Sequence, residues 1–159
     1  MDRSADDIAT AYHEAGHAVL ALALGRPVHR VSILPNHLRL GQCELKKGAA
    51  RPSPDVLERD VLILLGGPAA EARYTGRYDW DAADRDLRAM RSLTEMRAAS
   101  QRQIERLERR MLDKTEHLLD RPGVWAAAQR IAEELLRCTT ISGRAARHFF
   151  EVAIAQAER

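Results

Sequence analysis

The residues whose types and spacing point to chemistry are His-Glu-Ala-Gly-His at positions 13–17. Four residues make just over one helical turn, so the imidazoles of His13 and His17 project from the same face and can share one metal ion. Glu14 lies about 100° round the helix from His13, where it can hydrogen-bond a water on the metal. The pattern is typical of a zinc site with two ligands and one general base. In a shuffled chain of this composition it would occur in roughly 2 of 100 cases, so coincidence is a weak explanation.

A third ligand must come from elsewhere in the chain, because a catalytic zinc normally takes three protein ligands and leaves a fourth position open. An acidic residue at the start of a helix that packs on the motif helix is geometrically attractive, which favours Asp86, with Asp84 on the opposite flank. The ordinary preference for Asp at helix starts is the alternative explanation for these carboxylates. The candidates are Glu71, Asp79, Asp81, Asp84, Asp86, His29, His37, His117 and His148.

The elements that must position these residues are mostly helical. Apolar residues recur at helical spacing from Ser4 to Leu24, so the motif lies inside an amphipathic helix that ends at Gly25. Residues 28–46 alternate apolar and polar side chains on both sides of a break at Pro35-Asn36, which predicts a small hairpin or two to three short strands.

The rest of the chain predicts further helices separated by glycine and proline. Ser53 and Pro54 open the first of them, and Gly66-Gly67 is expected to end it before Pro68 starts a short helix. Ser142 can cap the last helix. The expected helices cover residues 53–65, 68–76, 82–119, 124–137 and 143–157. The fold class is therefore mainly α with a small β-sheet or hairpin (α+β), in a single domain over residues 1–159.

Composition narrows the function classes. The chain has 159 residues, of which 45% are apolar and 30% charged, which argues against a disordered protein. No segment approaches the roughly 18 apolar residues of a membrane span. The net charge is only +2, so no nucleic-acid partner is expected, and the five Arg among residues 97–110 are read as a solvated helix face. With two cysteines and no secretory leader, a cytoplasmic location is expected.

Three stretches resemble the peptidase domain of FtsH-type ATP-dependent zinc proteases. Residues 11–19 (Ala-Tyr-His-Glu-Ala-Gly-His-Ala-Val) and residues 27–35 (Pro-Val-His-Arg-Val-Ser-Ile-Leu-Pro) look like its start. Residues 64–71 (Leu-Leu-Gly-Gly-Pro-Ala-Ala-Glu) are similar to the family's Gly-Gly-Arg-Ala-Ala-Glu segment, and residues 118–143 resemble its helical tail. The resemblance covers essentially the whole chain and implies a helical zinc-metallopeptidase domain.

The resemblance also implies a ligand set. The family's third zinc ligand is the Asp of a Gly-Ala-x-x-Asp-hydrophobic motif, and residues 82–87 (Ala-Ala-Asp-Arg-Asp-Leu) align with it without a gap. This carries the ligand role onto Asp86, although Ala82 replaces Gly and the neighbouring Asp84 leaves the register open. Glu71 matches the acidic residue after the double glycine, for which a supporting role beside the zinc ligands is expected.

Two modules of the family are missing from this sequence. FtsH-type proteases carry an ATPase module and membrane-spanning segments ahead of the peptidase domain, whereas this chain has neither a Gly-x-x-x-x-Gly-Lys-Ser/Thr phosphate loop nor a span. We therefore expect no ATP site here, and a separate ATPase or unfoldase is a possible partner. The chain is either a stand-alone relative or a piece of a longer protein. Because family members assemble as hexamers, the resemblance makes a homo-oligomer possible.

The function predicted is a zinc-dependent endopeptidase, with one Zn²⁺ per chain, that cleaves flexible or unfolded polypeptides. Zinc lowers the pKa of its bound water toward about 7, Glu14 takes the proton, and Glu14 returns it to the leaving amine. An exposed strand edge could hold the substrate by backbone hydrogen bonds, and an ordinary surface strand is the alternative. The candidates for that edge are Gly41, Gln42, Cys43 and Glu44.

Two other functions remain open on the sequence. One is a domain that binds zinc and a partner without cleaving anything, although the retained Glu14 argues against it. The other is a helical interaction domain with structural zinc, which would need four protein ligands. Proteases with a third His six residues after the motif are excluded, because residues 18–23 are Ala-Val-Leu-Ala-Leu-Ala.

Overall fold

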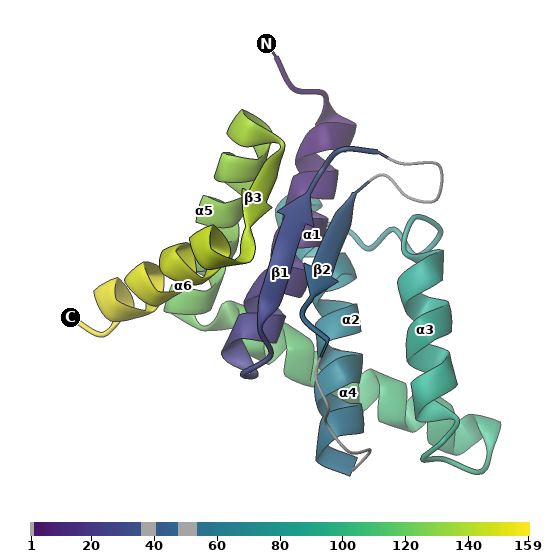
Figure 1. Ribbon diagram of the computed structural model, residues 1–159. Coiled ribbons are helices and arrows are strands. Elements are labelled where there is room, and N and C mark those ends of the chain that lie inside the picture. Colours follow the sequence, from purple (N-terminus) through teal and green to yellow (C-terminus); the bar gives the residue numbers. More distant parts are fainter. Residues whose placement is uncertain (1, 36–40, 48–53) are drawn as a thin grey trace.

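The computed structural model describes residues 2–35, 41–47 and 54–159, and it confirms a mainly α fold with a small β-sheet (Figure 1). Asn36, His37 and Ser53, which entered the expectations above, lie outside the described residues. The elements are α1 (Ala5–Ala23), β1 (Val28–Ser32), β2 (Gln42–Leu45), α2 (Pro54–Thr75), α3 (Asp84–Thr94), α4 (Gln101–Asp120), α5 (Pro122–Cys138), β3 (Thr140–Ser142) and α6 (Gly143–Ala157).

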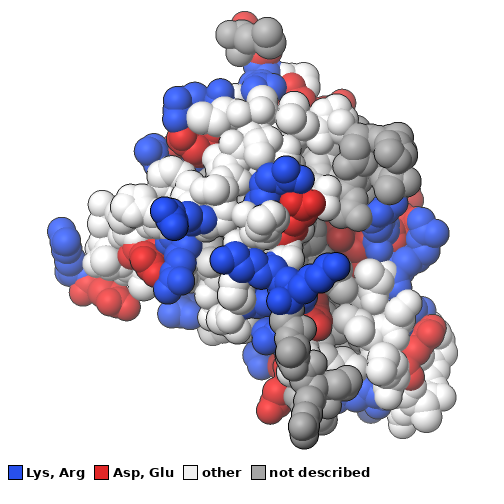
Figure 2. All heavy atoms as spheres, in the orientation of Figure 1, with Lys and Arg blue, Asp and Glu red and all other residues white. Residues whose placement is uncertain are grey.

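Helix α1 begins where its sequence predicts. The Ser4 side chain accepts a hydrogen bond from the Asp7 backbone N–H, and the Asp7 carboxylate accepts one from the Ser4 N–H, which completes a capping box. The helix packs against α2, α5 and the sheet, so it is buried on most sides. Acidic and basic side chains mix over the visible surface of the molecule (Figure 2). None of the described helices is long and apolar enough to cross a lipid bilayer.

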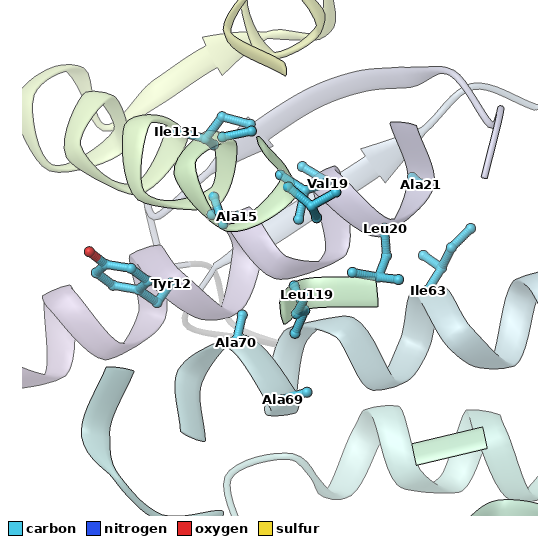
Figure 3. Packing of buried hydrophobic residues seen from close by; sticks show 14 of the residues in the cluster. Tyr12, Ala15, Val19, Leu20, Ala21, Ile63, Ala69, Ala70, Leu119 and Ile131 are labelled. Carbon is cyan, nitrogen blue, oxygen red and sulfur yellow. The ribbon is translucent and has the colours of Figure 1, made fainter. Parts of the chain in front are cut away.

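The core is built around the apolar face of α1. Ala15, Val19 and Leu20 are fully buried and lie between α5, which contributes Ile131, and α2, which contributes Ala70 (Figure 3). Small alanines on these helices let their backbones approach one another, and the larger side chains fill the remaining space. The motif helix is therefore held rigidly from both sides.

Helix α2 corrects one expectation. Gly66 and Gly67 were expected to end a helix and Pro68 to begin another, but all three lie inside the continuous helix α2. Glycine costs about 1 kcal/mol and proline about 3 kcal/mol inside a helix, so local propensity favours a break. Packing outweighs it, because a Cβ atom on Gly16 of α1 would lie 2.1 Å from the Gly66 carbonyl oxygen. The glycines mark a close approach of two helices, not a helix end.

The single helix expected over residues 82–119 is also wrong, because the structure has two helices there. Helix α3 ends at Thr94, and α4 begins at Gln101 after Ser100, whose side chain accepts a hydrogen bond from the Gln103 N–H. Ser100 is a strong N-cap residue, and this local signal was overlooked because the apolar spacing continued through it. The break matters for the site, because it frees α3 to lie against α2 with its first turn beside α1 (Figure 1).

The sheet has three antiparallel strands in the order β2-β1-β3. Val31 of β1 pairs with Cys43 on one side and with Ile141 on the other. The β1–β2 pairing confirms the expected hairpin, whereas β3, from residues 140–142, was not expected. Ser142 ends β3 and caps α6 by accepting from the Ala145 N–H, as predicted. Among the described residues, β2 is an edge strand.

Candidate metal centre

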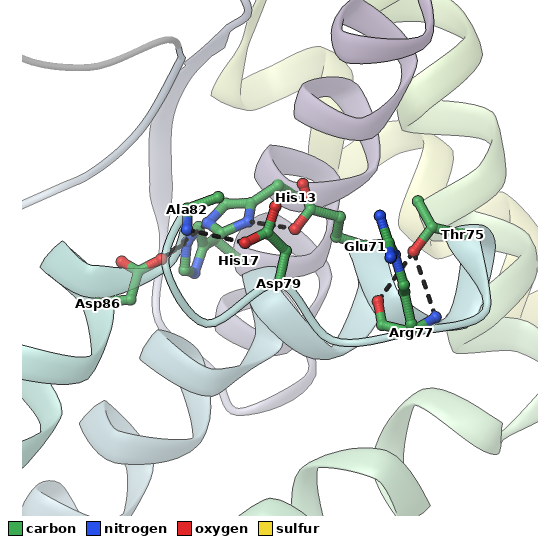
Figure 4. A network of polar contacts seen from close by, with 8 residues as sticks. All are labelled: His13, His17, Glu71, Thr75, Arg77, Asp79, Ala82 and Asp86. Atoms are coloured by element: carbon green, nitrogen blue, oxygen red, sulfur yellow. Dashed lines mark hydrogen bonds and ion pairs between the residues drawn. The ribbon is translucent and has the colours of Figure 1, made fainter.

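Three side chains from two distant segments converge at one point (Figure 4). His13 and His17 extend from α1, and Asp86 extends from the first turn of α3. The Asp86 Oδ2 atom lies 2.7 Å from His13 Nε2 and 3.2 Å from His17 Nε2. One ligand atom from each residue lies within 4.8 Å of the other two. The structure thus brings together the two histidines and one carboxylate that the sequence singled out.

The outer nitrogens of both imidazoles face hydrogen-bond acceptors on α2. His17 Nδ1 lies 2.8 Å from the Ile63 carbonyl oxygen, so it donates its proton there and turns Nε2 toward Asp86. His13 Nδ1 lies 3.8 Å from Glu71 Oε2, which is buried and has no hydrogen-bond partner in the structure. A buried carboxylate oxygen is unfavourable without a partner, and metal-binding histidines usually donate their second N–H to such a group. Glu71 is therefore placed to orient His13.

Gly67 leaves the space in which the two imidazoles meet. A Cβ atom at this position would lie 2.3 Å from His17 Nε2 and 2.7 Å from His13 Nε2. Both of these nitrogens face Asp86, so a side chain at position 67 would occupy the point of convergence. The sequence analysis used Gly67 only as a helix end. A double glycine one turn before Glu71 was the signal that could have placed it at the site.

We expect Gly67→Ala to weaken zinc binding by about 10- to 100-fold, because the new methyl group pushes both imidazoles out of position. A zinc titration of the purified chain measures this effect. Gly66→Ala is the matched control, since its Cβ atom would meet the Gly16 carbonyl oxygen and Leu20 instead. We expect it to lower the melting temperature with little effect on zinc affinity. Equal zinc affinities in Gly67→Ala and the wild type would show that this glycine has only a packing role.

The histidines and Asp86 also shift one another's pKa values. Burial disfavours the charged imidazolium, but the hydrogen bonds to Asp86 and Glu71 outweigh it and raise the pKa of His13 to about 10. The pKa of His17 is raised too, because the Asp86 charge outweighs burial. The two rings lower the pKa of Asp86 despite its burial. Without metal, the cluster is therefore an ion pair held by a proton that zinc would replace.

Zinc binding at pH 8 is accordingly expected to release about one proton per ion, because His13 is still protonated in the metal-free protein. A histidine with the usual pKa of about 6.5 would release almost none at this pH. Calorimetry in buffers of different ionisation enthalpy counts the protons.

The same raised pKa has a consequence for folding. In the metal-free protein the His13 pair stabilises the fold fully below about pH 6.5, and this stabilisation is lost as the pH rises through about 10. Zinc uptake at pH 8 without proton release would contradict the His13–Asp86 pairing.

A cleft of about 400 Å³ opens beside the cluster. Glu14 is 7% exposed and lines this cleft together with both histidines. Cys43 of β2 lines the opposite side, and burial and then the Glu14 charge raise the pKa of its thiol well above the usual value. Cys43 therefore stays protonated and is not a nucleophile at neutral pH. The remaining lining residues are Thr10, Gly41, Leu45, Ile63, Leu64, Glu71, Ala82, Arg85 and Asp86.

The other candidate ligands lie elsewhere. Asp84 is exposed and forms an ion pair with Arg88 at 2.6 Å. Asp79 accepts a hydrogen bond from the Ala82 N–H in the turn before α3 (Figure 4). Within the described ranges, the histidine and acidic side chains arranged to hold a metal are His13, His17 and Asp86. The candidates outside this group are Asp81, His29, His117 and His148, which are all exposed.

The donor set fits zinc. Two imidazole nitrogens and one carboxylate oxygen are ligands that zinc prefers, and three protein ligands beside an open cleft are typical of a catalytic site. The buried Glu71 carboxylate and the Ile63 carbonyl satisfy the outer nitrogens of the imidazoles, as metal-bound histidines require.

Comparison with known proteins supports this chemistry. The chain is 48% identical over 67 residues to the ATP-dependent zinc metalloprotease FtsH of Magnetococcus marinus, a match that covers 39% of this chain. It is 40% identical over 85 residues to the ATP-dependent zinc metalloprotease FtsH 3 of Sorangium cellulosum, which covers 51% of this chain. It is 37% identical over 93 residues to the FtsH of Cupriavidus metallidurans, which covers 55% of this chain.

These matches cover only 10–14% of the length of the three relatives. No protein-family model matches the chain. About half of this chain is thus similar in sequence to FtsH-type zinc metalloproteases, which confirms the family resemblance of its motifs.

Proposed function

We propose that this chain is a zinc-dependent endopeptidase domain that cleaves flexible or unfolded polypeptides. The observation that carries the proposal is the convergence of His13, His17 and Asp86 in a cleft that also contains Glu14. The similarity to proteins named zinc metalloproteases supports the same reaction class. One zinc ion per chain would be held by His13, His17 and Asp86.

The residues of the site have separate tasks in this reaction. Zinc, when bound, supplies a Lewis acid that makes water acidic enough to lose a proton near neutral pH. Glu14 accepts that proton on its carboxylate and then delivers it to the nitrogen of the leaving amine. Glu71 and the Ile63 carbonyl hold the two imidazoles in orientation. The buried position of Glu14 keeps competing water away from its carboxylate.

Strand β2 is placed to hold the substrate backbone. It lies at the edge of the described sheet, and Gly41, Cys43 and Leu45 line the cleft. A Cβ atom at Gly41 would lie 2.8 Å from Thr10 Cγ2 and 3.0 Å from Glu14 Cγ, so the strand begins directly against α1. A peptide that pairs with the open edge of Gln42 to Glu44 would pass the metal ligands in an extended form. Backbone pairing of this kind accepts many sequences.

The wider assembly follows from the same proposal. The chain acts as one domain over residues 1–159 in the cytoplasm, either alone or as the peptidase part of a larger ATP-dependent protease. Because this chain carries no phosphate loop, any unfolding of folded substrates would come from a separate ATPase, and a homo-oligomer would fit the family resemblance.

The test is hydrolysis of a labelled unfolded protein, such as casein, by the zinc-loaded chain. We expect stoichiometric zinc uptake, cleavage that a chelator stops, and recovery when zinc is restored. A domain that binds zinc and a partner without catalysis would take up zinc and leave the substrate intact. The open cleft and the carboxylate of Glu14 favour the enzyme over this alternative.

A further inference from the structure

A second cavity lies along β2, next to the metal cleft. It has a volume of about 650 Å³ and is lined by Arg26, His29 and residues 42–47. Cys43 and Leu45 line both this cavity and the metal cleft. The two cavities therefore meet along the strand that is proposed to hold the substrate.

The charge of the second cavity is positive and concentrated at one end. Arg26 pairs with Asp60 at 3.1 Å, and Glu44 pairs with Arg30 at 2.9 Å, so these charges are largely compensated. Lys46 and Lys47, the lysine pair, are exposed, and neither takes part in an ion pair with a described carboxylate. Figure 2 shows basic side chains gathered over the end of β2. The lysine pair is thus available to an external anion.

The lysine pair lies on the path of an extended substrate. A peptide along the open edge of β2 advances about 3.3 Å per residue, as the strand does. The lysine pair follows the cleft-lining residues Cys43 and Leu45 by one to four positions. A substrate residue that reaches the lysine pair would therefore be about two to four positions from the peptide bond at the metal site.

We propose that the lysine pair binds an acidic side chain of the substrate, so that the peptidase prefers segments with Asp or Glu about two to four residues from the cleaved bond. The preference would hold on the side of the bond that lies toward the end of β2. It rests on the proposed function, because it names the sequence that the same site selects. Backbone pairing with β2 would supply general affinity, and the lysine pair would supply selectivity.

The experiment compares peptides that carry Glu or Gln at each position around a single cleavable bond. We expect kcat/KM to be about 5- to 10-fold higher for Glu at the positions facing the lysine pair, as for exposed charge contacts, and the preference to shrink in high salt. Lys46→Glu/Lys47→Glu should abolish or reverse the preference. Arg102→Glu/Arg109→Glu on α4 changes the net charge equally away from both cavities and should preserve it.

Binding measured without cleavage separates this proposal from the proposed function. Fluorescence anisotropy of the same peptides with the zinc-loaded full chain should show the same Glu preference, whether or not any peptide is cut. If Glu and Gln peptides bind and react equally, the lysine pair selects nothing. If Arg85→Gln removes the preference and the lysine variants retain it, the acidic side chain binds on the α3 side of the cleft and the proposal is wrong.

Discussion

Replacing Glu14 by Gln is expected to lower peptide hydrolysis by about 10²- to 10⁴-fold while zinc binding stays close to normal. Gln has nearly the same shape, so the buried position beside the cleft remains filled. It cannot accept a proton, however, so it can neither activate water nor protonate the leaving amine. The measurement is kcat on an unfolded labelled substrate, together with a zinc titration of the same preparation.

His13→Ala is the control that separates the base from the metal. This variant loses one of the three ligands, so zinc binding and hydrolysis should fall together. A Glu14→Gln enzyme with full activity would show that another group takes the proton, and Glu71 is the other carboxylate in the cleft besides the ligand Asp86.

Asp86→Asn should weaken zinc binding by more than about 100-fold, whereas Asp84→Asn should change it by less than about twofold. Asp86 supplies the only carboxylate oxygen within reach of both imidazoles among the described residues, at 2.7 and 3.2 Å. The Asn amide lacks the negative charge that pairs with zinc. Asp84 points to solvent and pairs with Arg88, so its loss removes a weak surface contact.

The comparison of these two variants also tests the register of the third ligand. Both substitutions lie in the first turn of α3 and remove one negative charge each, so helix-start effects are matched. Competition with a chromophoric chelator gives the two affinities on one scale. The reverse order of affinities would move the ligand by two residues and would require α3 to rotate from its position in this structure.

Local patterns in the sequence were sufficient for the parts of the site that lie within one helical turn. The spacing of His13 and His17 specifies a shared helix face, because the geometry of an α-helix does not depend on the surrounding fold. The caps at Ser4 and Ser142 are similarly local, since each hydroxyl bonds a backbone N–H three residues away. These expectations needed no knowledge of tertiary packing.

Where packing competes with local preference, the sequence was less informative. Gly66, Gly67 and Pro68 are individually unfavourable inside a helix, and only the close contact with α1 explains why α2 continues through them. Strand β3 has three residues and exists because β1 offers it a partner. The break before Ser100 was visible in the sequence but was obscured by continuing apolar spacing.

By itself, then, the sequence determined the type of chemistry: two imidazoles one turn apart with a carboxylate between them, on a helix in a mainly α domain. Only the tertiary structure placed Asp86, and not Asp84, against those imidazoles, 69 and 73 residues away along the chain. The reason is that a metal site closes through space. The packing of α2 against α1 and α3 against α2, with Gly67 leaving room between them, sets which carboxylate arrives there.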